Sequence, residues 1–384
     1  MSGAGPRDCL TGTLLDGRYR VHAEIATGGT STVYRGLDVR LDRPVALKVM
    51  DARYAADQQF LSRFALEARA VARLKDPGLV AVYDQGTDGR RPYLVMELVE
   101  GGTLRELLAE RGPMPPHAVA AVLRPVLGGL AAAHRAGLVH RDVKPENVLI
   151  SDGGEVKIVD FGLVRAVAAA GTTSAGVILG TAAYLSPEQV RDGDTTPRSD
   201  VYGVGILAFE LLTGQTPFCG DSALSVAYQR LDNDVPPPST VIDGVPRRLD
   251  QLVACATARN PADRYADALQ MGLELDAIAD ELALPDFRVP APRNSALHRS
   301  AARPDAPHHP TRQLTRSWIT DPENQTDCGA GEFAGIQMSD FALARQHARR
   351  MVLIWIAVVL SVTGLVAGVA WTIGSNLAGL LPAL

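Results

Sequence analysis

The chain has 384 residues, of which 46% are hydrophobic and 21% charged, and this composition excludes a fully disordered protein and predicts about two or three structural units. The formal net charge of −5 excludes nucleic acid as a bulk electrostatic partner. The four cysteines have neither the spacing of a disulfide framework nor that of a zinc site, and the first ten residues lack the apolar run of a cleaved signal peptide.

Strand patterns dominate the front of the chain. After a small, polar lead-in at residues 1–17, apolar residues alternate with polar ones from Tyr19 to Ile25, which predicts a half-buried strand. A glycine turn follows at residues 27–30, and further strands are predicted at 32–35, 44–49 and 93–96. One helix interrupts them, because Phe60, Phe64, Glu67 and Val71 share one helical face. Helical patterns then continue to residue 282, which predicts a strand-rich lobe, a helix-rich lobe and a cleft between them.

The composition changes after residue 282. Residues 283–350 are rich in Pro, Ala, Arg, His and Ser and are predicted to form a flexible linker. Residues 351–373 carry no charge and have a tryptophan near each end, which predicts one transmembrane helix. Three arginines precede this span within residues 345–350, so we expect the N-terminal side in the cytoplasm and an external tail of residues 374–384.

Two charged residues occupy positions that are otherwise apolar. Glu67 lies on the apolar face of its predicted helix, and Lys48 lies within an apolar strand. A buried charge is costly without a partner, so we expect the two to form an ion pair that aims the lysine ammonium into the cleft. The alternative is that each side chain reaches water separately.

The segment VHRDVKPENVLI at residues 139–150 is followed, after a short turn, by VKIVDFG at residues 156–162. Together they hold two carboxylates, an amide and a lysine. Magnesium needs oxygen ligands, a phosphate needs cations, and a hydroxyl nucleophile needs an acceptor for its proton. This combination indicates phosphate chemistry.

With these motifs, residues 18–282 resemble the eukaryotic-like (Hanks-type) protein kinases, and more closely the bacterial membrane serine/threonine kinases of the actinobacterial Pkn group. The glycine turn, VALK, HRDVKPEN and DFG follow the order of that family. Residues 180–188, 198–203 and 260–265 are similar to its later motifs. The resemblance implies an α+β, bilobal fold with a small, mostly-β N-lobe at 18–97 and a mostly-α C-lobe at 101–282.

The resemblance also implies a role for each matching residue. Asp142 would accept the proton of the substrate hydroxyl, Lys144 would steady the transferred phosphate, and Asn147 and Asp160 would hold Mg²⁺ or Mn²⁺. Glu188 and Arg264 would form a supporting ion pair. Lys48 would contact the α- and β-phosphates, and residues 97–99 would form the hinge. The residues implied in ATP binding are Ile25, Ala26, Gly28, Gly29, Ser31, Val33, Ala46, Lys48, Glu67, Met96, Glu97 and Val99. Ala26 and Ser31 replace the outer glycines of the family loop, which bears on nucleotide affinity more than on the reaction.

The resemblance further implies how the protein is used and controlled. Lys144 followed by Pro-Glu-Asn is the serine/threonine form of the loop, and the substrates would be the chain itself and cytoplasmic proteins in signalling. A phosphate on Thr173, or on its neighbours Thr172 and Ser174, could pair with Arg141 and order the activation segment. A homodimer of kinase domains is compatible with the resemblance, and direct nucleic-acid binding is not expected.

Two other functions stay open at this stage. One is a pseudokinase that binds nucleotide and acts as a scaffold, and the other is a membrane-tethered interaction protein whose linker is the functional part. Lys48, Asp142, Asn147 and Asp160 are all present, and this intact set argues against both.

Overall fold

The computed structural model describes residues 10–52, 58–161, 182–191, 193–220 and 222–301, together with two short strands, β10 (Glu332–Phe333) and β11 (Ile336–Gln337). The chain divides into two compact units, residues 1–309 and residues 310–384. In the second unit β10 pairs with β11 in antiparallel fashion. The predicted membrane span, the external tail and the three candidate phosphorylation sites lie outside the described residues.

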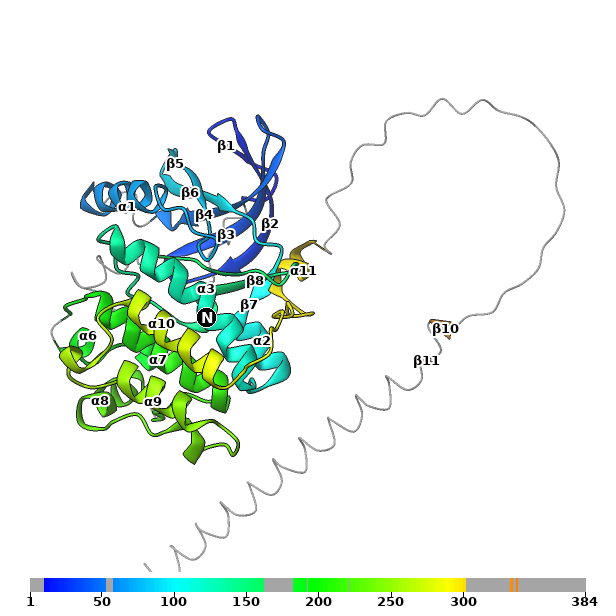
Figure 1. Ribbon diagram of the computed structural model, residues 1–384. Coiled ribbons are helices and arrows are strands. Elements are labelled where there is room, and N and C mark those ends of the chain that lie inside the picture. The colour runs from blue at the N-terminus through cyan, green and yellow to red at the C-terminus, as the bar shows by residue number, and fades with distance from the viewer. Residues whose placement is uncertain are drawn as a thin grey trace, which may run out of the picture. The chain divides into compact units, whose positions relative to one another are not determined.

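The front of the first unit is an antiparallel sheet in the strand order β1-β2-β3-β4-β6-β5 (Figure 1). Its strands are β1 (Leu14–Leu15), β2 (Tyr19–Thr27), β3 (Ser31–Asp38), β4 (Arg43–Met50), β5 (Val82–Asp88) and β6 (Arg91–Glu97). Helix α1 (Gln58–Val71) packs on one face through Phe64 and Ala68. The predicted strands and the predicted helix are therefore all present, in the predicted order.

Strand β4 explains how a lysine comes to lie inside this lobe. Residues 45–50 are all buried, and the side chains of a strand alternate between its two faces. Val45, Leu47 and Val49 join the cluster on the far face, whereas Ala46 and Met50 join the cluster beneath α1. Lys48 belongs to the second set, so its side chain lies on the face toward α1.

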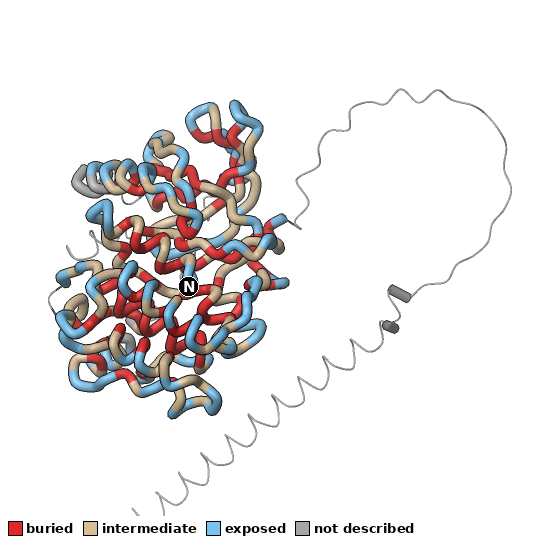
Figure 2. The backbone as a smooth tube through the Cα atoms, viewed as in Figure 1, coloured by how far each residue is buried: buried red, intermediate tan, exposed pale blue. Residues whose placement is uncertain are grey.

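The second lobe is helical. Its helices are α2 (Leu104–Arg111), α3 (Pro116–Arg135), α6 (Pro187–Arg191), α7 (Pro197–Thr213), α8 (Ala223–Asp232), α9 (Arg247–Ala256) and α10 (Ala268–Glu281), with short 3₁₀ turns at η2 (Pro145–Asn147), η3 (Ala182–Tyr184), η4 (Pro238–Thr240) and η5 (Pro261–Asp263). In α7 every residue from Ser199 to Leu212 is buried, and α3 packs against it (Figure 2). Among the described helices, α3 alone is long and apolar enough to cross a membrane, but its apolar residues belong to the core of this lobe.

A small sheet in the order β7-β8-β9 positions the functional loops between the two lobes. Its strands are β7 (Gly101–Thr103), β8 (Val148–Ser151) and β9 (Val156–Ile158). The loop with Asp142 ends where β8 begins, and Asp160 follows β9, so the β8–β9 hairpin brings the two motifs together. The predicted bilobal α+β fold is confirmed.

The linker prediction is wrong for residues 284–301. These residues pack against the helical lobe and include a further helix, α11 (Ala296–Ala301). Val289 belongs to the core of that lobe, and Leu297 is 5% exposed. Composition misled the prediction because few apolar residues are needed when a segment packs on a core that has already formed.

Candidate active site

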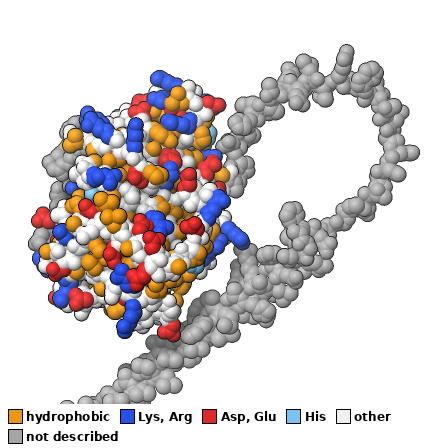
Figure 3. Space-filling view, in the orientation of Figure 1, with side chains coloured by type: hydrophobic (Ala, Val, Ile, Leu, Met, Phe, Trp, Pro, Cys, Tyr) orange, Lys and Arg blue, Asp and Glu red, His pale blue; other side chains and the backbone are white. Residues whose placement is uncertain are grey.

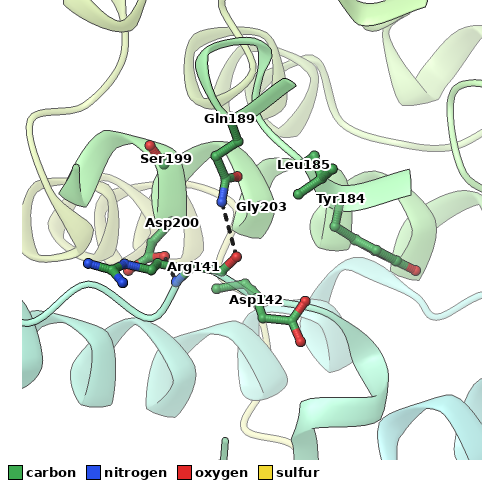
Figure 4. A pocket seen from close by; sticks show the side chains of 9 residues that line it. Arg141, Asp142, Tyr184, Leu185, Gln189, Ser199, Asp200 and Gly203 are labelled. Atoms are coloured by element: carbon green, nitrogen blue, oxygen red, sulfur yellow. Dashed lines mark hydrogen bonds between the residues drawn. The ribbon is translucent and has the colours of Figure 1, made fainter. Parts of the chain in front are cut away.

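A buried aspartate on α7 shapes the loop that carries Asp142. The two oxygens of Asp200 accept hydrogen bonds from the backbone N–H groups of His140 and Arg141, both at 2.8 Å, and Oδ2 also lies 2.8 Å from His134 Nε2. Arg141 has φ = 69°, a left-handed conformation that a non-glycine residue rarely adopts without such support. Figure 4 shows the result, with the carboxyl group of Asp142 directed away from Asp200.

A glutamine on α6 supports the same loop from the other side. Gln189 Nε2 donates a hydrogen bond to the carbonyl oxygen of Arg141 at 3.1 Å, drawn as the dashed line in Figure 4. The amide oxygen of Gln189 in turn accepts from the backbone N–H of Ser186 at 2.9 Å. The loop is therefore tied to both α6 and α7. Neither Asp200 nor Gln189 was among the predicted site residues.

Asp142, Lys144 and Asn147 meet at one carboxylate oxygen. Lys144 Nζ lies 2.7 Å from Asp142 Oδ2, and Asn147 Nδ2 donates to the same oxygen at 3.1 Å and to the Asp142 carbonyl at 2.8 Å. Asn147 is 6% exposed, and because its Nδ2 donates both of these bonds, its amide oxygen is the atom suited to bind a metal. The structure thus brings together these three predicted residues.

Lys48 has a different partner from the one predicted. Its ammonium lies 2.7 Å from Asp160 Oδ1. The ion pairs formed among the described residues do not include one between Lys48 and Glu67. Asp160 has φ = 66°, and with this backbone conformation its carboxylate reaches the ammonium on β4. A buried ammonium needs one carboxylate close by, and Asp160 meets that need here. Lys48 therefore pairs with Asp160 and not, as predicted, with Glu67, which is half-buried on α1.

The predicted adenine pocket is a continuous apolar surface. Ala46 and Met96 are directly paired across β4 and β6, and both belong to one cluster that Val33 and Val99 extend. Leu149 on β8 packs against the same cluster and was not among the predicted site residues. The available signal was the apolar run at residues 148–150, because alternation along a strand turns Leu149 to the face opposite Val148 and Ile150.

The edges of this pocket are polar or exposed. The hinge residue Glu97 is held by Lys157, whose Nζ lies 2.5 Å from Glu97 Oε1. The turn between β2 and β3 is closed by a hydrogen bond from Gly28 N–H to the carbonyl of Ser31 at 2.8 Å. Among the remaining residues predicted in this loop, Ile25 is half-buried, whereas Ala26 and Gly29 are exposed. Exposed backbone at this turn is accessible to a ligand in the cleft.

Glu188 and Arg264 form a bidentate ion pair. Both guanidinium Nη atoms of Arg264 donate to Glu188 at 2.8 Å, and the Arg264 side chain is fully buried. Ser199 Oγ adds a third bond to Glu188 at 2.7 Å. Burial by itself would raise the pKa of Glu188, but the bonds from Arg264 and Ser199 outweigh it and hold that pKa below its ordinary value.

A second arginine, which was not among the predicted site residues, links α2 to the catalytic loop. Arg105 Nε donates to Glu146 at 2.7 Å, its Nη1 donates to Glu210 at 2.6 Å, and its Nη2 donates to the Tyr184 hydroxyl at 2.6 Å. The Tyr184 hydroxyl also donates to Glu210. Burial and the Glu210 carboxylate raise the pKa of Tyr184. Since Glu146 lies next to Asn147, this network fixes the end of the catalytic loop.

The comparison with known proteins decides the family. Residues 19–272 match the family model described as "Protein kinase domain". The chain belongs to the protein kinase family. It is 72% identical over 398 aligned residues to serine/threonine-protein kinase PknL of Mycobacterium bovis, covering 98% of this chain and 99% of that protein, and equally similar to PknL of Mycobacterium tuberculosis. Serine/threonine-protein kinase PknB of Mycobacterium leprae is 39% identical over 82% of this chain and 51% of its own length.

Solved structures agree with the fold. The kinase domain of Mycobacterium tuberculosis PknI superposes with a TM-score of 0.58 at 26% identity, covering 71% of this chain and all of that one. The predicted likeness to serine/threonine kinases of the Pkn group is confirmed, and the protein is a serine/threonine protein kinase. Use of ATP and a divalent metal follows from the family.

The residues present fit such a metal. Among the described residues, no group of three or more His, Cys, Asp or Glu is arranged to hold a metal by itself. Magnesium is usually bound by one or two protein oxygens together with phosphate oxygens and water, so Asn147 and Asp160 suffice as its protein ligands.

Proposed function

We propose that this kinase is anchored in the cell membrane and transfers the γ-phosphate of ATP to serine and threonine residues of itself and of cytoplasmic proteins. The observation that carries the proposal is the arrangement of Asp142, Lys144 and Asn147 around one carboxylate oxygen, with the Lys48–Asp160 pair across the cleft. This arrangement combines a proton acceptor with cations for phosphate.

Each of these groups has a separate task in the proposed reaction. Asp142 accepts the proton of the substrate hydroxyl, and Lys144 neutralises charge on the transferred phosphoryl group. Asn147 and Asp160 would hold Mg²⁺, or Mn²⁺ in its place, and the metal would supply neutralisation of the phosphate charge. Lys48 contacts the α- and β-phosphates, which orients ATP beneath the turn at Gly28. The apolar surface of Ala46, Met96, Val99 and Leu149 takes the adenine ring.

Three features of the sequence support the membrane anchor. The stretch at residues 351–373 is uncharged, arginines precede it, and none follow. In this proposal the kinase domain comprises residues 18–282 and faces the cytoplasm. The docked residues 284–301 follow it, a linker leads from there to residue 350, and residues 374–384 lie outside.

We also propose that autophosphorylation activates the enzyme. Arg141 lies directly before the catalytic Asp142, and a phosphate on Thr173 would offer it a strong acceptor. Thr172 and Ser174 are the alternatives. Such a pair would order the activation segment next to the catalytic loop.

The activity is tested with the full chain, ATP and Mg²⁺, by following phosphate incorporated into the chain and into a protein substrate. Lys48→Met and Asp160→Asn are each expected to lower the rate by about 100-fold or more, since oriented charges on the phosphates are the main catalytic contribution. The matched controls Lys75→Met and Asp194→Asn change exposed residues of the same types and should keep the wild-type rate. Full activity in both active-site variants would overturn the assigned roles.

A further inference from the structure

The segment after the last helix of the kinase domain is held by acidic side chains. Glu106 Oε1 on α2 accepts from the backbone N–H of Ala296 at 2.7 Å, and Glu110 Oε2 accepts from the N–H of Arg293 at 2.8 Å. At the β8–β9 turn, Asp152 lies 3.2 Å from His298 Nε2. Three carboxylates of the domain thus meet one stretch of chain outside the matched residues 19–272.

Apolar contacts add to this docking. Val289 and Leu297 are 3% and 5% exposed, and Pro292 is buried. A Cβ atom added to Gly102 on β7 would lie 2.4 Å from Pro292 Cγ and 2.6 Å from Ser295 Cβ, so the segment touches the β7 backbone directly. A covered strand at this position cannot shift without displacing the segment.

The docked segment reaches both lobes. Helix α11 contacts β2, which leads into the glycine turn of the N-lobe, and β7, which pairs with β8 behind the catalytic loop (Figure 1). Strand β7 begins just after the hinge at 97–99. Glu106, which binds the segment, is adjacent in sequence to Arg105, which binds Glu146 in the catalytic loop. The segment therefore lies where the two lobes are joined.

We propose that residues 284–301 form a strap that holds the two lobes in the arrangement that binds ATP, and that the chain beyond residue 301 controls the kinase by docking or releasing this strap. The inference rests on the proposed kinase activity. Residues 302–350 follow α11 in the chain, so a force or modification that acts on them is transmitted along the backbone to α11, the last docked element of the described domain.

The expected size of the effect follows from the population of the binding-competent arrangement. If release of the strap lowers that population to about one tenth, the apparent dissociation constant of ATP rises about tenfold. The strap contributes no side chain to the cleft in our assignment, so the rate at saturating ATP should change little, by about twofold or less.

The test uses the full chain with two strap variants. Leu297→Asp places a charge on the buried face of α11. Ala296→Pro removes only the N–H that binds Glu106, since proline is tolerated at the first position of a helix. Asp286→Asn, at an exposed residue of the same segment, is the control. The Kd of a fluorescent ATP analogue with Mg²⁺, the KM for ATP and hydrogen exchange of residues 97–103 and 284–301 are measured for each.

We expect Leu297→Asp to raise Kd and KM about tenfold and Ala296→Pro about threefold, with faster exchange in both segments and no change in the control. Faster exchange at 284–301 with an unchanged Kd would overturn the proposal that the strap supports ATP binding. A lower Kd or a faster reaction would also overturn it, because either result would show that the segment is autoinhibitory. Unchanged exchange at 284–301 in both variants would refute the docking itself. A wild-type chain that binds the analogue in this strap-dependent way but transfers no phosphate would instead refute the proposed function.

Discussion

Replacing Arg264 by alanine should destabilise the helical lobe more than the same replacement of an exposed arginine. The change removes two hydrogen bonds to Glu188, both at 2.8 Å, and the donors to the carbonyls of Ala258, Arg198 and Arg259 at 2.7, 3.0 and 3.1 Å. Breaking a buried ion pair by removing one partner costs about 3–5 kcal/mol, because a buried charge is left without compensation. At about 2–4 °C per kcal/mol, we expect Tm to fall by roughly 6–20 °C.

The measurement is thermal and urea unfolding of the full chain, with Arg259→Ala as the matched control. Arg259 makes an ion pair of similar length with Asp234, at 2.7 Å, but the two side chains are 48% and 74% exposed. An exposed pair contributes about 0–1 kcal/mol, so this control should stay within about 1 kcal/mol of the wild type. If Arg264→Ala loses no more stability than Arg259→Ala, the argument from burial is wrong.

Three further predictions concern acid stability, the anchor and the activation segment. The pKa of Glu188 is lowered in the folded state, so its ionised carboxylate stabilises the fold above the ordinary value of 4.5, and this stabilisation is lost as the pH falls through the folded-state pKa. The difference in unfolding free energy between the wild type and Glu188→Gln should therefore shrink on acidification below 4.5. A difference that stays constant with pH would contradict this. The double variant Val359→Arg/Val366→Arg should no longer be found in the membrane fraction, because each charge near the centre of the span costs roughly 2.5–3.5 kcal/mol of insertion free energy. Continued attachment of this variant would refute the span. Mass spectrometry of the active chain should find phosphate chiefly on Thr173, and stoichiometric phosphate elsewhere with none at 172–174 would refute the activation site.

The local motifs could be recognised from the sequence because their residues act as neighbours along the chain. Asp142, Lys144 and Asn147 lie within six positions, so a single short loop keeps them close together. The alternation of apolar residues around Lys48 likewise predicted a buried strand, since side chains of a strand alternate between two faces. Gly28 and its turn followed from the same pattern of short strands.

The contacts between distant segments needed the tertiary structure. Nothing near Lys48 in the sequence shows whether its ammonium meets Glu67 or Asp160, since both are carboxylates on other elements. Asp200 was unassigned because its partners, the N–H groups of His140 and Arg141, belong to the backbone and leave no trace in the sequence.

Residues 284–301 show the same division most clearly. Their composition of proline, arginine and alanine is that of a linker, and taken alone they have too few apolar residues to form a core. They are ordered because Val289 and Leu297 reach a core built by other elements, and because Glu106 and Glu110 supply acceptors for their backbone. By itself, the sequence determined the family, the two lobes and the local catalytic set, because these depend on short-range patterns. Only the tertiary structure decided which carboxylate pairs with Lys48 and where residues 284–301 dock, because the free energy of those contacts comes from surfaces that distant segments create together.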